Sequence, residues 1–117
     1  MLNISLGKAG EIVAGKFLVA SGFKIVTQNY KCLIGEIDIV ATHKDALYFI
    51  EVKTRTSLVF GWPAEAVTPR KQNKLRQLAL YYLAAHPYGG PVTFGVVEVL
   101  YNRYRRCYQV NFVPHAF

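Results

Sequence analysis

Residues 35–55 read GEIDIVATHKDALYFIEVKTR, and this stretch decides the fold. It contains two apolar runs rich in β-branched and aromatic residues, Leu33–Ala41 and Ala46–Thr56, which we expect to be strands. The polar segment between them, Thr42–Asp45, predicts a short turn. The two strands should therefore form an antiparallel hairpin.

Charged residues interrupt both apolar runs at intervals of two. Because side chains on a strand alternate between the faces of its sheet, Glu36 and Asp38 should share one face of the first strand. Ile37 and Ile39 should then point to the other face. The second strand should likewise place its charged residues together, and these are Glu51, Lys53 and Arg55.

The length of the turn fixes which charged residues face each other. A two-residue turn at 44–45 would place Asp38 opposite Glu51. It would also place Glu36 opposite Lys53. Directly opposed Cβ atoms lie about 4.5–5.5 Å apart, so two carboxylates in that arrangement repel unless a cation lies between them. Mg²⁺ suits such a site, because it binds through one or two carboxylates together with water and phosphate oxygens.

The same residues predict a reaction. Mg²⁺, or Mn²⁺, held by Asp38 and Glu51 would polarise a scissile phosphate and acidify a bound water. Lys53 would orient that water or stabilise developing negative charge, and Arg55 would grip a neighbouring phosphate. The predicted chemistry is metal-dependent phosphodiester hydrolysis. A solvated strand face with cross-strand ion pairs would give the same short pattern, so this alternative stays open here.

The rest of the chain predicts two helices and three further strands. Apolar residues at spacings of three and four indicate helices at Leu6–Ser21 and Arg70–His86, with an irregular segment at Ser57–Pro69. The order αβββαββ indicates an α/β fold with a mixed five-stranded sheet flanked by helices, in a single domain spanning residues 1–117. The remaining strands are expected at Phe23–Asn29, Pro91–Leu100 and Tyr104–Val113.

Composition and charge narrow the class of protein. Lys and Arg number 14 against 7 Asp and Glu, which gives a net charge of +7 and favours a nucleic acid as partner.

A hydrophobic share of 52% and a mean hydropathy of +0.18 exclude disorder as the main state. Two cysteines, Cys32 and Cys107, cannot form a disulfide scaffold. No apolar run suits a membrane span or a signal peptide, so we expect a cytoplasmic protein without a membrane partner.

Asp38 together with Glu51-Val52-Lys53 resembles the PD-(D/E)xK signature of nucleases with the restriction-endonuclease-like fold. The resemblance runs almost end to end to the YraN proteins, a small bacterial family of endonuclease-like proteins. The matching pieces are Gly10-Glu11, Gly35–Val40, Ile50–Arg55, Phe60–Val67, Lys71, Lys74 and Ala116-Phe117.

This family is similar to archaeal Holliday-junction resolvases, in which a glutamate of the first helix joins the strand carboxylates. The resemblance therefore implies Glu11 and the backbone carbonyl of Val52 as further metal ligands. It also implies a homodimer, because two sites are needed to cut two strands. Relatives often carry Arg-Phe-Asp where this chain has Thr93-Phe94-Gly95, so the chain lacks that carboxylate.

The leading prediction is an endonuclease acting on DNA, with branched DNA among the expected substrates. Two alternatives stay open: a nucleic-acid-binding module without activity, and a protein-interaction subunit with a relic site.

Arg103, Arg105 and Arg106 are explained by a charged turn and strand edge that opposes aggregation. The second helix carries a basic group that forms either a phosphate-binding ridge or a solvated face, and its members are Arg70, Lys71, Lys74 and Arg76.

Overall fold

The computed structural model describes residues 5–57 and 68–117. It confirms the predicted order αβββαββ and the mixed five-stranded sheet. Most of the predicted irregular segment, with the matching piece Phe60–Val67, lies outside the described residues. The elements are α1 (Leu6–Ala20), β1 (Lys24–Cys32), β2 (Gly35–His43), β3 (Ala46–Ser57), α2 (Pro69–Ala85), β4 (Val92–Asn102) and β5 (Cys107–Val113).

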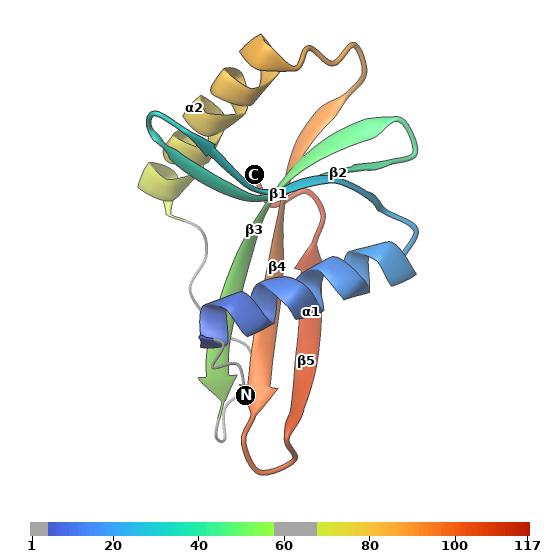
Figure 1. The fold of residues 1–117 in the computed structure, drawn as a ribbon, viewed down its shortest axis with the longest axis vertical. Helices are drawn as coiled ribbons and strands as arrows, with labels where there is room; N and C mark the ends of the chain where they lie inside the picture. Colours follow the sequence, from blue (N-terminus) through green and yellow to red (C-terminus); the bar gives the residue numbers. More distant parts are fainter. Residues whose placement is uncertain (1–4, 58–67) are drawn as a thin grey trace.

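The five strands follow one another across the sheet in chain order. β3 and β4 are parallel, and the other three neighbouring pairs are antiparallel. The parallel pair requires a crossover, and α2 supplies it. Figure 1 shows α1 crossing β3, β4 and β5, whereas α2 lies beside the hairpin of β1 and β2.

Each helix covers its own apolar cluster. Ala14 and Leu18 of α1 are fully buried with Ile39 and Ile50 of the sheet. Leu75, Leu78, Ala79 and Tyr82 of α2 pack with a second set of sheet residues. That set includes Ile37, Val40, Leu47 and Phe49. The site described below lies between these two clusters, where β2 and β3 separate.

Capping explains where both helices begin. The Ser5 side chain accepts a hydrogen bond from Lys8 N at 3.1 Å, and Thr68 Oγ1 accepts one from Lys71 N at 3.2 Å. Such caps satisfy backbone donors that have no partner inside the helix. Pro69 suits the first turn of α2 because it has no N–H to leave unpaired. No helix in residues 5–57 and 68–117 has the length and apolar character needed to cross a membrane.

The predicted hairpin of β2 and β3 is confirmed, and its turn has the two residues, 44 and 45, that the expected pairing assumed. Lys44 and Asp45 have φ angles of 48° and 67°, and His43 pairs with Ala46. Two consecutive positive φ angles match the tightest kind of hairpin turn. The ladder then runs only as far as Ile39 paired with Ile50, which is one position before the predicted pairing of Asp38 with Glu51.

The structure corrects two expectations for the far end of β2. Glu36 is not paired with Lys53 but with Lys31 of β1. Ile37 does not share a face with Ile39, because it packs in the α2 cluster. Both differences have one cause: β2 leaves β3 after Ile39, and the tip of the β1–β2 hairpin lies against α2 (Figure 1).

Candidate active site

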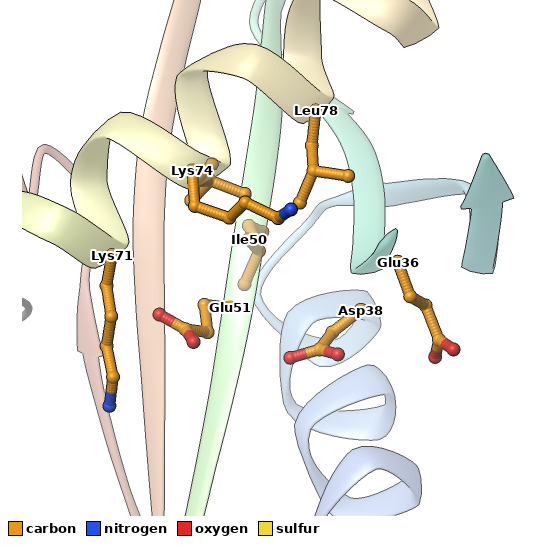
Figure 2. Close-up of a pocket in the computed structure, with 8 residues that line it drawn as sticks. Glu36, Asp38, Ile50, Glu51, Lys71, Lys74 and Leu78 are labelled. Atoms are coloured by element: carbon orange, nitrogen blue, oxygen red, sulfur yellow. The ribbon is translucent and has the colours of Figure 1, made fainter. Parts of the chain in front are cut away.

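A cleft of about 220 Å³ opens where β2 and β3 separate beneath α2. One wall carries carboxylates from the two strands, and the other carries lysines from the helix (Figure 2). The cleft thus places groups that bind cations opposite groups that bind phosphate. Its lining residues are Glu36, Asp38, Ile50, Glu51, Lys71, Lys74, Leu75 and Leu78.

Asp38 lies at the point of separation. Its Oδ2 accepts a hydrogen bond from the backbone N–H of Val52 at 2.8 Å. The carboxylate thus contacts the β3 backbone just beyond the last paired position of the β2–β3 ladder, Ile39 with Ile50. This contact fixes the side chain in the cleft and ties it to the strand that carries Glu51 and Lys53.

The surroundings of Asp38 disfavour its ionised form. Burial raises its pKa from 3.8 to about 6, and the charges of Glu11, Glu51 and Glu36 act in the same direction. The hydrogen bond from Val52 works against this shift but does not cancel it. A cation bound at the carboxylates would reverse the effect, since opposite charge stabilises the ionised form.

The tightest group of carboxylates consists of Glu11, Glu36 and Asp38. One oxygen from each lies within 4.8 Å of the others. The structure thereby brings together a residue of α1 and two residues of β2. Glu51 lines the cleft and influences Asp38 electrostatically, although it is not part of this tight group.

Gly10 explains how Glu11 reaches the strand carboxylates. A Cβ atom at this position would overlap Oγ1 of Thr54 on β3, so only glycine lets α1 approach the strand this closely. Glu11 follows directly on the same turn of the helix. The amino group of Lys8 lies 3.5 Å from its carboxylate, at the edge of the cluster.

Asn29 is a member of the site that sequence reasoning missed. With its amide oriented to suit its neighbours, its nitrogen donates to Oε1 of Glu11 at 3.0 Å and to Oε1 of Glu36 at 2.6 Å. Its φ of 54° is left-handed, which asparagine adopts more readily than most residues. The sequence offers no signal for this role, because three separate elements must meet to create it.

Lys53 interacts with Lys71 of α2, whereas its neighbour Val52 packs against the α1 cluster. Burial lowers the pKa of Lys53, and the neighbouring charge of Lys71 lowers it further. Glu51 acts in the opposite direction but does not balance these effects. The contact between Lys53 and Lys71 was not predicted, because nothing in the sequence places the start of α2 against β3.

The basic residues of α2 separate into two groups. Arg70, Lys71 and Lys74 line a second groove of about 590 Å³ along the first turns of the helix. Arg76 instead lies over the Phe117 ring, with its guanidinium carbon 5.1 Å from the ring centre. Arg55 of β3 is half-buried one position beyond Thr54. The groove is thus lined by Arg70, Lys71 and Lys74 but not by Arg76.

The departure at Gly95 is next to a residue of the cleft, Ile50, but Gly95 is not itself a lining residue. Gly95 pairs with Ile50, whose side chain packs in the α1 cluster. A Cβ atom there would lie 3.0 Å from a ring carbon of Phe112 and 3.3 Å from the carbonyl oxygen of Val113. The phenylalanine ring therefore fills the space that a side chain at this position would need.

The fold and the cleft define an α/β protein whose strand carboxylates face lysines of a covering helix. The chain belongs to the uncharacterised protein family UPF0102, the YraN family, whose profile matches residues 10–100. The predicted family is thereby confirmed.

Three relatives illustrate the extent of the similarity. A UPF0102 protein of Moorella thermoacetica is 44% identical over 112 residues, which cover 95% of this chain and 93% of the relative. One of Clostridium novyi is 40% identical over 116 residues, or 98% and 97% of the two chains. One of Caldanaerobacter subterraneus is 40% identical over 115 residues, or 97% and 94%. The similarity thus extends over nearly the whole length of each protein.

Proposed function

We propose that this protein is a metal-dependent endonuclease that hydrolyses phosphodiester bonds in DNA, including branched DNA. The observation that carries the proposal is the environment of Asp38. Its carboxylate is held by the Val52 N–H in a cleft where burial and three other carboxylates raise its pKa, while lysines form the opposite wall. Such an arrangement costs stability unless a cation is bound, and this is typical of functional sites.

The donor atoms fit Mg²⁺ or Mn²⁺. The candidate ligands are carboxylates of Asp38, Glu51 and Glu11 with the Val52 carbonyl, and these are the hard oxygen donors that such ions prefer. Because one oxygen of Asp38 accepts the Val52 hydrogen bond, the other oxygen would bind the ion. When bound, the ion supplies the positive charge that polarises a phosphate and lowers the pKa of a water molecule.

The lysines supply the remaining parts of the mechanism. The lowered pKa of Lys53 suits a group that passes a proton or stabilises charge developing on a phosphate oxygen. Lys71 and Lys74 on α2 would bind the phosphates on either side of the cleaved bond. Glu36 would hold Glu11 in position, because the Asn29 amide nitrogen donates hydrogen bonds to both carboxylates. Arg55 would hold a further phosphate along β3.

The first test compares wild type with Asp38→Asn, using Asp45→Asn as a matched control. Both variants remove one negative charge, but Asp45 is exposed in the hairpin turn, where its positive φ suits asparagine. Mg²⁺ and Mn²⁺ are titrated by calorimetry, and cleavage is assayed on linear, nicked, flapped and four-way DNA. We expect metal binding and cleavage in wild type and Asp45→Asn, and neither in Asp38→Asn.

The alternatives give different results in the same assay. A binding module without activity would retain or gain affinity for DNA in Asp38→Asn, and wild type would cleave none of the four substrates. A protein-interaction subunit would show no salt-dependent DNA binding at all. Sedimentation of wild type alone and with four-way DNA tests the expected homodimer.

A further inference from the structure

The turn between β4 and β5 presents an exposed basic surface that the candidate active site does not include. Arg103, Tyr104, Arg105 and Arg106 occupy four consecutive positions, and all are exposed, Tyr104 to 80%. Three of the six arginines of the chain therefore lie in one turn. We call residues 103–106 the arginine turn.

The arginine turn has a defined backbone. Asn102 Oδ1 accepts hydrogen bonds from the backbone N–H groups of Tyr104 and Arg105, each at 3.0 Å. Arg106 completes the turn with a φ of 51°. An asparagine that binds the backbone two and three residues ahead is a common way to hold a turn. The backbone that carries the arginines is therefore held in one conformation. This lowers the entropic cost of binding a ligand through their side chains.

Protection of the sheet edge does not account for these arginines. β5 begins at Cys107 rather than at the predicted Tyr104, so the arginines precede the edge strand. The strand itself, CYQVNFV, contains no charged residue. Charges that oppose edge-to-edge pairing would be expected along the strand, where they would meet an incoming chain.

The register of the sheet places the arginine turn relative to the cleft. β4 is parallel to β3, with Val96 beside Glu51 and Asn102 beside Ser57. Six strand residues separate these two levels, which corresponds to about 20 Å. Figure 1 shows the turn at the far end of β4 and β5, beyond the end of β3. Lys53 and Arg55 lie on β3 between the two levels.

We propose that the arginine turn is a second contact for the DNA substrate, and that it binds the backbone of a duplex arm about six base pairs from the cleaved bond. The spacing follows from the 20 Å separation and the rise of about 3.4 Å per base pair. Arginine binds phosphate through two parallel N–H donors, and a tyrosine hydroxyl also donates to phosphate oxygens. This inference rests on the proposed function and adds how the substrate lies on the protein.

The test measures DNA binding as a function of salt. Wild type, Arg103→Gln/Arg105→Gln and Lys16→Gln/Lys24→Gln are titrated into a labelled duplex, in EDTA and in Ca²⁺. The lysine variant removes the same charge from exposed positions on α1 and β1. Loss of two phosphate contacts should reduce the slope of log K against log salt by about 1.8 and weaken binding about tenfold at low salt. The lysine variant should change the slope by less than half of this.

One result of this titration would overturn the inference, and two further measurements test it independently. If the arginine and lysine variants have equal slopes and affinities, the arginine turn is not a contact, while Asp38-dependent cleavage would leave the proposed function standing. A lower melting temperature of the arginine variant would call for Tyr104→Ser, which leaves the Asn102 turn intact and should still weaken binding. Neutral methylphosphonate linkages five to seven base pairs from the cleaved bond should weaken wild type and have less effect on the arginine variant.

Discussion

Asp38 carries a carboxylate in surroundings that disfavour its ionised form. Asp38 is half-buried, and withdrawing a charge from water without a partner of opposite charge is costly. Burial and three neighbouring carboxylates raise the pKa of this side chain, and the hydrogen bond from the Val52 N–H lowers it by less. Without a cation beside it, the ionised carboxylate therefore lowers the stability of the folded chain.

Asp38→Asn should therefore stabilise the metal-free protein. Because the folded-state pKa of Asp38 is raised to about 6, the folded chain binds this proton more tightly than the unfolded chain. Wild type should consequently lose stability as the pH rises from 4 through 6, and the variant should lack that decline. Above pH 7 the gain should be about 1–3 kcal/mol. Denaturant unfolding in EDTA at several pH values measures this, and a less stable variant would contradict it.

Lys71 is expected to control the ionisation of Lys53. After burial, its charge is the largest cause that lowers the Lys53 pKa. Lys71→Gln should raise that pKa, and Lys16→Gln, a distant exposed change, should leave it as it is. The titration of the Lys53 Cε signal by NMR measures the shift. An unchanged titration in Lys71→Gln would show that the two amino groups do not interact in solution.

At the scale of elements, the decisive feature is the close approach of α1 to β3. Gly10 contacts Thr54 without room for a Cβ atom, and this contact brings Glu11 to the carboxylates of β2. The start of α1 is thus fixed by packing as well as by its Ser5 cap. A small displacement of the helix would separate Glu11 from Asp38.

Gly10→Ala should lower stability by about 1–3 kcal/mol, as overpacking in a tight contact does. Gly7→Ala is its control, because it lies in the same helix with nothing within 4 Å of the added Cβ atom. The control should be neutral or stabilising, since alanine favours helices. Thermal unfolding compares the two. Calorimetry should also show weaker Mg²⁺ binding in Gly10→Ala only, and equal stability of both variants would refute the packing argument.

Across the whole molecule, the acidic and basic side chains are unevenly distributed, and the net charge of +7 does not convey this. Four of the seven acidic residues lie in or beside one cleft, and these are Glu11, Glu36, Asp38 and Glu51. Elsewhere on the described residues basic side chains outnumber acidic ones, and two groups of them lie at the start of α2 and in the arginine turn. Such a pattern attracts a polyanion and directs a cation to one place.

Binding of a divalent cation should stabilise the whole chain. At 100 times the dissociation constant, a ligand that binds only the folded state adds about 2.7 kcal/mol. We expect Mg²⁺ to raise the melting temperature of wild type, and EDTA to reverse the rise. Asp38→Asn should melt at the same temperature with and without Mg²⁺. Differential scanning fluorimetry measures both, and equal increases in the two proteins would place the ion elsewhere.

The sequence by itself determined the local structure and the chemistry of the strands. The polar segment 42–45 indicated the hairpin, and assuming a two-residue turn at 44–45 gave the register observed from His43 to Ile39. The residue types did not require that turn, because Lys44 is not a residue that readily adopts the positive φ it has there. Apolar spacing located both helices within a residue or two, and the family was evident from motifs spread along the chain. Asp38, Glu51 and Lys53 could be selected because charged residues interrupt otherwise apolar strands.

Only the tertiary structure decided how these elements meet. The separation of β2 from β3, which moves Ile37 to the α2 cluster and opens the cleft, depends on where α2 packs. The Asn29 amide joins Glu11 to Glu36, and Lys71 reaches Lys53, through contacts between residues far apart in the chain. Patterns in sequence report which face of an element is apolar. They do not report which other element covers that face, because this depends on the packing of the entire chain.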